Sequence, residues 1–126
     1  MTTTTRLKVL ARDGGWVLTG ADSDEIGLVN DYLGYLGDRH YAPGTRRSYA
    51  FDLLAFCGWL LEQELRIEQV DAAAVLRFLA SCQGLAPATI NRRLAAVNGM
   101  FGFRMMRDPE ATNPMPRGPA ARRVSA

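Results

Sequence analysis

The sequence contains few of the residues from which metal sites and nucleophilic sites are built. It has one histidine, two cysteines and a single lysine, Lys8, among 126 residues. Cys57 and Cys82 lie far apart and belong to no Cys-x-x-Cys or paired-histidine pattern, so they do not form a zinc site. Each lies in an apolar helical pattern, and we expect both to be buried, reduced thiols. The sequence therefore offers no catalytic constellation, no metal site and no cofactor site.

Long apolar segments are also missing. No apolar run approaches the roughly 20 residues that span a bilayer, and the N-terminus, Met-Thr-Thr-Thr-Thr, lacks the basic and apolar regions of a signal peptide. We therefore expect a cytoplasmic protein without membrane contact. The hydrophobic content of 48% and the charged content of 22% are sufficient for one domain with a real core and additional tails.

Positive charge is concentrated after residue 41, and nearly all of the basic residues are arginine. Residues 1–41 carry four basic and six acidic side chains, whereas residues 42–126 carry 11 basic and seven acidic side chains. Fourteen of the 15 basic residues are arginine. Arginine binds phosphate bidentately, which lysine does not, although a GC-rich genome produces the same bias. The positions of the arginines are therefore more informative than their number.

Four segments with helical periodicity predict an all-α fold, a compact, non-parallel four-helix bundle. The expected helices span about residues 23–40, 43–64, 72–82 and 87–106, and apolar residues recur at helical spacing in each. The predicted inward-facing residues are, helix by helix, Ile26, Val29, Leu33 and Leu36; Tyr49, Leu53, Phe56 and Leu60; Val75, Leu76, Phe78 and Leu79; and Ile90, Leu94, Val97 and Phe101.

The two ends of the chain have a different character from the helical segments. Residues 6–20 contain two short runs around an Asp-Gly-Gly turn, which predicts a small hairpin that must dock or remain mobile. Residues 113–126 are rich in proline and arginine without apolar periodicity, which predicts a flexible basic tail or linker. We therefore divide the chain into a leader (1–22), a helical domain (23–112) and a tail (113–126).

The pattern Ala-Pro-x-Thr occurs twice, each time where a helix is expected to begin. It occupies residues 42–45 and again residues 86–89. Proline fits the first helical turn because its missing N–H has no partner there. Free backbone N–H groups, the helix dipole and nearby arginines together favour phosphate. Two such helix starts predict a nucleic-acid clamp, and the candidate DNA contacts are Thr45, Arg46, Arg47, Thr89, Asn91, Arg92 and Arg93.

A second stripe on the last helix lies opposite its apolar stripe. It comprises Thr89, Arg92, Ala96 and Gly99, and its small side chains allow a partner's backbone to approach closely. DNA is one possible partner and another helix is the other, and Arg92 at the head of the stripe favours DNA. Asn91 is either a contact to an adenine edge or a solvated first-turn residue.

Residues 45–60 resemble a signature of tyrosine recombinases and phage integrases. Thr45, Tyr49, Leu53, Phe56 and Trp59 fit the pattern T-x-x-x-Y-x-x-x-L-x-x-F-x-x-W-L, which belongs to the N-terminal core-binding domain of that family. Residues 85–103 look like the last helix of the same domain, and residues 113–114 resemble the Asn-Pro that usually follows it. The resemblance extends over about residues 24–116. It implies a SAM-like helical bundle that closes over one face of a DNA duplex during DNA recombination or integration.

The same resemblance implies that the chemistry lies in another domain. Catalysis in the family needs two arginines, a lysine, histidines and a nucleophilic tyrosine in a second, larger domain. This chain has a single histidine, His40, and no His-x-x-Arg motif. We therefore expect no catalytic residue, and either a fragment or a chain that stops where a longer relative continues. The implied partners are double-stranded DNA, the catalytic domain of the same protein and neighbouring recombinase protomers.

One departure from the family pattern concerns the helix caps. The family often has serine before each proline, whereas this chain has Ala42 and Ala86. The hydroxyl contact at these positions is lost, together with capping that contributes about 1 kcal/mol per helix.

A second interpretation is a helical protein–protein interaction module. In that case the small-residue stripe of the last helix docks another helix and the arginines are solvated. The two interpretations differ in salt dependence, because DNA binding weakens steeply with salt whereas apolar docking does not.

Overall fold

The computed structural model describes residues 6–116. Its elements are, in chain order, β1 (Lys8–Arg12), β2 (Gly15–Thr19), α1 (Asp24–Asp38), α2 (Pro43–Gln63), the 3-10 helix η2 (Ile67–Gln69), α3 (Ala72–Ser81) and α4 (Pro87–Arg107). The predictions of a four-helix fold and of an N-terminal hairpin are confirmed, and each helix ends within two residues of its expected bounds. The sequence did not predict η2.

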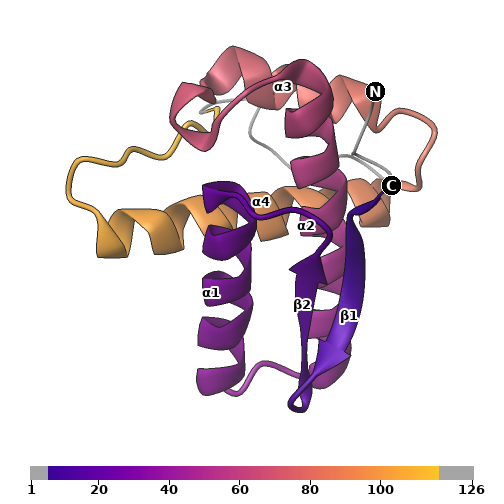
Figure 1. Ribbon diagram of the computed structural model, residues 1–126. Helices are drawn as coiled ribbons and strands as arrows, with labels where there is room; N and C mark the ends of the chain where they lie inside the picture. Colours follow the sequence, from indigo (N-terminus) through magenta and orange to yellow (C-terminus); the bar gives the residue numbers. More distant parts are fainter. Residues whose placement is uncertain (1–5, 117–126) are drawn as a thin grey trace.

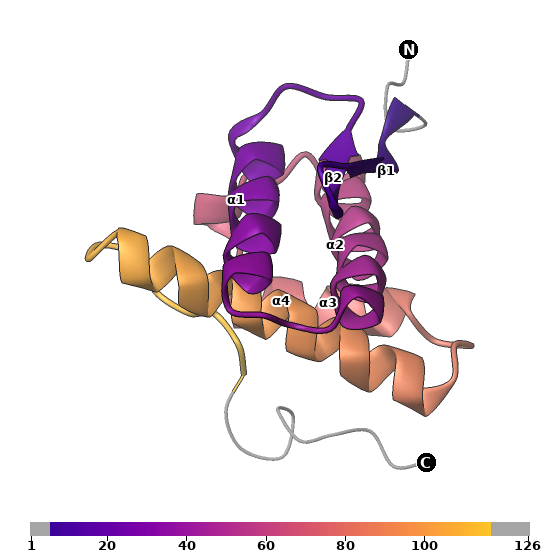
Figure 2. The same ribbon diagram turned by 90° about the horizontal axis from the view of Figure 1, so that it is seen from below.

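The pair formed by α1 and α2 is the centre of the fold, and the other elements cover it. The hairpin packs on one face of this pair, and α4 crosses the opposite face (Figures 1 and 2). Helix α3 lies across the end at which α2 finishes (Figure 1). Phe56 of α2 and Phe101 of α4 are completely buried between these layers, with their ring centroids 6.1 Å apart. The crossing of α2 and α4 is therefore the middle of the core.

Most of the predicted apolar stripes face the core, with exceptions on α3 and α4. Val75 and Phe78 are buried, but Leu76 is 43% exposed, so its predicted inward position was wrong. Helix α3 is a single short helix on the end of the domain, and only one narrow face of it meets the core. Tyr49 of α2, Leu79 of α3 and Ile90 of α4 are half-buried and pack against the core. Leu94 of α4 is also half-buried. The buried residues of α4 are Ala96, Val97, Met100, Phe101 and Phe103.

The helix ends follow the local sequence signals. The side chain of Ser23 accepts a hydrogen bond from the Ile26 N–H (3.2 Å), and that of Asp71 accepts one from the Ala74 N–H (2.8 Å), as N-caps do. At the end of α1, His40 has a φ of 63°. The Tyr41 N–H then reaches back to the carbonyl of Leu36, which completes a Schellman motif. His40 therefore terminates α1 as the left-handed residue after its C-cap.

One side chain of α1, Asn30, binds the backbone of the hairpin directly. Asn30 accepts a hydrogen bond from the Leu18 N–H (2.7 Å) and donates one to the Leu18 carbonyl (3.0 Å). The carboxamide thus provides the outer edge of β2 with the donor and acceptor of a neighbouring strand. Asp13 and Gly14 both have positive φ, which is typical of a type I′ turn. A two-stranded hairpin is marginal alone, and here α1 and α2 supply the support it needs.

The chain after α4 is described only as far as Pro116. The Asn113 side chain donates a hydrogen bond to the Asn98 side chain of α4 (2.9 Å), and Met115 packs against the core. The remaining part of the predicted flexible tail, with Arg117, Arg122 and Arg123, lies outside the described residues.

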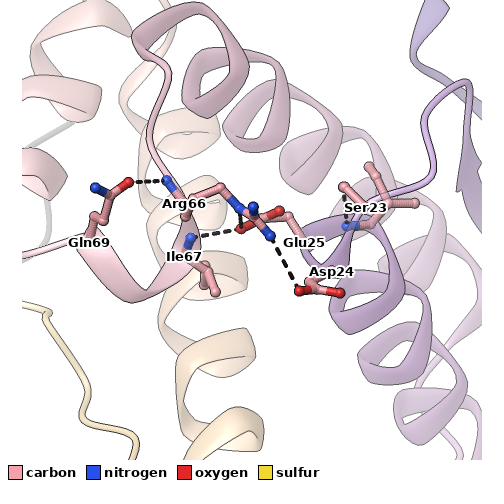
Figure 3. A network of polar contacts seen from close by, with 7 residues as sticks. Ser23, Asp24, Glu25, Arg66, Ile67 and Gln69 are labelled. Atoms are coloured by element: carbon pink, nitrogen blue, oxygen red, sulfur yellow. Dashed lines mark hydrogen bonds and ion pairs between the residues drawn. The ribbon is translucent and has the colours of Figure 1, made fainter.

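Glu25 ties the start of α1 to the segment between α2 and α3 (Figure 3). Its Oε2 accepts hydrogen bonds from the Ile67 N–H (2.8 Å) and from Nε of Arg66 (3.0 Å), and Arg66 also pairs with Asp24 (3.2 Å). Burial raises the pKa of Glu25, but the hydrogen bonds from Ile67 and Arg66 outweigh it and lower the pKa below its ordinary value of 4.5. The ionised carboxylate is therefore stabilising in the folded state.

Glu25→Gln is expected to lower the free energy of unfolding by about 1 kcal/mol at neutral pH, because a charge-assisted hydrogen bond becomes a neutral one. A carboxylate whose pKa is depressed by folding stabilises the protein above its unfolded pKa and loses this contribution as the pH falls through the folded pKa. The difference between wild type and variant should therefore shrink below pH 4.5. Urea denaturation at pH 7 and at a series of lower pH values measures this difference in the free energy of unfolding. A difference that stays constant with pH would contradict the assigned role.

Candidate nucleic-acid interface

Helices α2 and α4 begin in the same way. Their N-caps, Ala42 and Ala86, make no side-chain capping bond, each helix has proline in its first turn, and neither first turn contains an acidic residue. The predicted helix starts at Pro43 and Pro87 are confirmed. Both helix N-termini therefore keep backbone N–H groups that no capping side chain occupies.

A buried ion pair joins the two helices. Asp52, in the middle of α2, is 0% exposed. Arg92 binds it bidentately, with Nε 2.7 Å from Oδ2 and Nη2 2.9 Å from Oδ1. Nε of Arg93 lies 3.3 Å from the same Oδ1. The hydrogen bond to Asp52 raises the pKa of Arg92. These three residues, which we call the Asp52 junction, attach the second turn of α4 to α2.

The Asp52 junction leaves an excess of positive charge near the start of α4. Two guanidinium groups share one carboxylate, and the side chains of Arg92 and Arg93 are 40% and 18% exposed. Arg92 is therefore both a structural residue and a residue that solvent reaches. Sequence reasoning missed the partner, although Asp52 was visible as an isolated acid between apolar residues of the second helix.

The small-residue stripe of α4 faces the protein interior. Ala96 is completely buried, and a Cβ added at Gly99 would collide with the hydroxyl of Tyr32 on α1. The prediction that this stripe favours DNA was therefore wrong for Ala96 and Gly99, because the closely approaching partners are helices of the same chain. Thr89 and Arg92, at the head of the stripe, are half-buried.

A different face of α4 is open to solvent, about one residue further around the helix. Ala88, Ala95 and Asn98 are exposed along it. Asn91 lies on the same side by helical spacing and is half-buried. This face combines small side chains with two amides. Of the predicted contacts on α4, Asn91 is the one that belongs to it.

The predicted contacts on α2 point in different directions. Arg47 is exposed, and its guanidinium carbon lies 5.0 Å from the ring centroid of Phe51. Thr45 is half-buried in the first turn. Arg46 turns toward the hairpin, where its Nε donates to the Tyr41 carbonyl (3.1 Å) and its guanidinium lies over Trp16. Arg46 and Arg47 therefore have different neighbours, although they are adjacent in the first turn of α2.

The thiols and other potential ligands add no further site. Cys57 and Cys82 are free and buried, as expected, and burial raises the pKa of the Cys57 thiol to about 12. Within residues 6–116, no three histidine, cysteine or acidic side chains gather in a way that would hold a metal ion. No helix in the same part of the chain is long and apolar enough to cross a membrane.

Comparison with known proteins finds similarity over the helical part of the chain. The profile of the phage integrase N-terminal SAM-like domain matches residues 29–108. A tyrosine recombinase of Synechococcus elongatus is 42% identical over 96 residues, with 65% of this chain and 30% of the relative covered. The tyrosine recombinase XerC of Treponema denticola is 32% identical over 91 residues, with 70% and 30% covered. XerD of Lacticaseibacillus casei is 30% identical over 91 residues, with 71% and 31% covered.

The similarity is partial in both directions. This chain spans about 30% of the length of these relatives, and the profile match begins after the hairpin. No solved structure matches the chain.

Proposed function

Because this chain belongs to the family of phage integrase N-terminal SAM-like domains, we propose that it binds double-stranded DNA as the core-binding domain of a tyrosine site-specific recombinase. It holds the duplex chiefly through phosphate contacts, with modest base readout. Cleavage and strand transfer belong to a catalytic domain of the same protein, and neighbouring recombinase protomers are further partners. The contribution of this domain to DNA recombination or integration is binding and orientation.

The observation that carries this proposal is the Asp52 junction between α2 and α4. Asp52 lies nine residues after Pro43, and Arg92 lies five residues after Pro87. At 1.5 Å per residue, the two uncapped helix starts lie about 14 Å and about 8 Å from the junction along their axes. Both distances are shorter than the roughly 34 Å of one turn of B-DNA. One duplex can therefore contact both helix starts at once, with Arg47 and Arg92 beside them.

The open face of α4 suits an approach to a groove. Ala88 and Ala95 have short side chains that let the helix backbone come close to a partner. Asn91 and Asn98 have amides, the group that pairs with adenine in the major groove, and Oδ1 of Asn98 also accepts a hydrogen bond from Asn113 (2.9 Å). We propose that this face, rather than the stripe containing Ala96, is directed toward the DNA.

The structure disfavours the alternative of a protein–protein docking module, because the surface on which that alternative was based is not exposed. It relied on the stripe of α4 that contains Ala96 and Gly99, and that stripe packs against helices of the same chain. The salt titration below separates the two functions, since docking through apolar surface is nearly independent of salt.

Arg47→Ala is expected to weaken binding to a fluorescein-labelled duplex about fivefold and to reduce the dependence of log affinity on log salt by about one phosphate contact. Arg47 is chosen because its one described contact is the exposed ring of Phe51, so the fold should be unaffected. Arg92→Ala/Arg93→Ala is a poor probe, because it leaves Asp52 buried without a partner. Fluorescence anisotropy at about 50 mM and about 200 mM salt measures the change.

Arg77→Ala is the matched control for this experiment. Arg77 is exposed on α3, and its loss changes the net charge by the same amount as the loss of Arg47. It should change the affinity less than twofold. Equal effects of the two substitutions, or no binding by the folded protein at low salt, would refute DNA binding through the start of α2.

A further inference from the structure

A cavity of about 390 Å³ lies where the hairpin turn meets the end of α1 and the start of α2. Arg12 and Trp16 line it from the hairpin, Gly34 and Gly37 from α1, and Arg46 from α2. In Figure 1 the hairpin turn, the end of α1 and the start of α2 all lie at the lower end of the molecule. The cavity therefore adjoins the start of α2, which we propose to contact DNA.

The guanidinium of Arg46 is fixed in this cavity by three elements. Its Nε donates to the Tyr41 carbonyl (3.1 Å), and its carbon lies 5.8 Å from the ring centroid of Trp16. A Cβ added at Gly37 would lie 3.0 Å from Nη1, and one added at Gly15 would lie 3.6 Å from it. The group thus sits in a slot formed by an aromatic ring and two glycines, where a side chain at Gly37 would crowd it and one at Gly15 would make ordinary van der Waals contact.

Arg46 forms no ion pair within the part of the chain that the structure describes. Among residues 6–116, no carboxylate forms an ion pair with Arg46 or with Arg12, although Asp13 and Asp38 also line the cavity. Both acids are exposed, as is Arg12, so water screens these three charges, whereas Arg46 is half-buried. A guanidinium held by one hydrogen bond, in a cavity that a second arginine also lines, is suited to bind a phosphate oxygen pair.

We propose that this cavity is a phosphate-binding site for the DNA backbone, formed jointly by Arg12 and Arg46 and organised by Trp16. The hairpin then extends the DNA-contacting surface beyond the start of α2. This inference rests on the proposed DNA-binding function. Arg12 lies outside residues 29–108, the part of the chain that the family profile matches.

Tryptophan fluorescence provides a local test, because the chain has two tryptophans and one of them lines the cavity. Trp59 is buried beside Phe56 and Phe78, so Trp59→Phe leaves Trp16 as the sole reporter. In this background a labelled duplex is titrated while DNA anisotropy and Trp16 emission are recorded together. Trp16 emission should change with the same midpoint as the anisotropy. Thermal unfolding of the variant confirms that it is folded.

Substitution of Arg12, the arginine that the hairpin contributes to the cavity, is a second and independent test of the site. Arg12→Ala should weaken duplex binding about fivefold and reduce the salt dependence by about one contact. Lys8→Ala is the matched control, since Lys8 is an exposed cation on the same strand and does not line the cavity. It should change the affinity less than twofold.

The two readouts distinguish failure of this site from failure of DNA binding as a whole. Anisotropy that reports binding while Trp16 emission is unchanged, or equal effects of Arg12→Ala and Lys8→Ala, would overturn the cavity site and leave the proposed function standing. Absence of any anisotropy change with folded protein at low salt would overturn both. Parallel changes of both signals, with a selective loss in Arg12→Ala, would support the site.

Discussion

Replacing Asp52 by alanine is expected to lower the free energy of unfolding by about 3 kcal/mol. The substitution removes a completely buried carboxylate and leaves the guanidinium groups of Arg92 and Arg93 without their partner. Removing one member of a buried pair typically costs about 3–5 kcal/mol. The lower end applies here, because the side chain of Arg92 is 40% exposed and regains water. The melting temperature should fall by about 15 °C for a domain of this size.

Asp31→Ala is the matched control for the Asp52 substitution. It breaks the ion pair between Asp31 and Arg107 (2.8 Å), whose side chains are 56% and 51% exposed. An exposed pair contributes less than about 1 kcal/mol. The double variant Asp52→Ala/Arg92→Ala should be less destabilised than the sum of its single variants, as expected of residues in contact. If Asp52→Ala were no more damaging than Asp31→Ala, the junction would not hold α4 on α2.

Asp52→Ala also distinguishes two effects that the Asp52 junction could have on the proposed DNA binding, one through local charge and one through the position of α4. Removing a negative charge near a phosphate backbone should strengthen binding if only the local charge matters. Loosening the second turn of α4 should weaken it, because the two helix starts then lose their fixed relative position. We expect weaker binding, measured by anisotropy at a temperature at which the variant remains folded. Stronger binding would mean that the Asp52 junction has no positioning role.

The helix boundaries could be predicted because their causes are local. Ser23 and Asp71 cap the helices that follow them, and Pro43 and Pro87 occupy first turns. Each of these signals acts within four residues of itself. The hairpin turn at Asp13 and Gly14 has the same property, since the positive φ of both residues is a local conformational preference.

The side-chain partners of the candidate site could not be predicted, because they are separated by long stretches of sequence. Asp52 and Arg92 are 40 residues apart, and no periodicity links them. Arg46 lies over Trp16 of the hairpin, and Asn30 of α1 binds the same hairpin through the backbone of Leu18. A prediction for Arg46 therefore required the tertiary arrangement of three elements.

The orientation of α4 was ambiguous in the sequence for a related reason. The helix has small residues on two faces, one containing Ala96 and Gly99 and the other containing Ala88 and Ala95. Hydrophobic periodicity does not distinguish them, because alanine and glycine are compatible with a close helix crossing and with an exposed surface. In the structure the face containing Gly99 packs against α1, where the hydroxyl of Tyr32 occupies the space that a side chain at Gly99 would need.

Alanine substitutions at Gly99 and Gly102 are accordingly expected to change stability in opposite directions. At Gly99 the new methyl group meets the hydroxyl of Tyr32, whose ring is buried against Phe103 with centroids 5.6 Å apart. Overpacking of this kind should cost about 2 kcal/mol. At Gly102, three residues further along the same helix, a Cβ meets nothing within 4 Å. Alanine there should stabilise the helix by about 1 kcal/mol.

Tyr32→Phe identifies the atom responsible for the expected loss. If the hydroxyl is the obstacle, Gly99→Ala/Tyr32→Phe should recover most of the stability that Gly99→Ala loses, measured by thermal and urea denaturation. Gly102→Ala should be unaffected by the same tyrosine substitution, because its methyl group is not in contact with α1. Equal stability of the two alanine variants would mean that α4 can rotate or shift on α1, and then the face containing Asn91 and Asn98 would not be fixed toward a partner. Opposite signs, with rescue at Gly99 alone, would show that the face containing Asn91 and Asn98, which we propose to bind DNA, is the one that α4 directs away from α1.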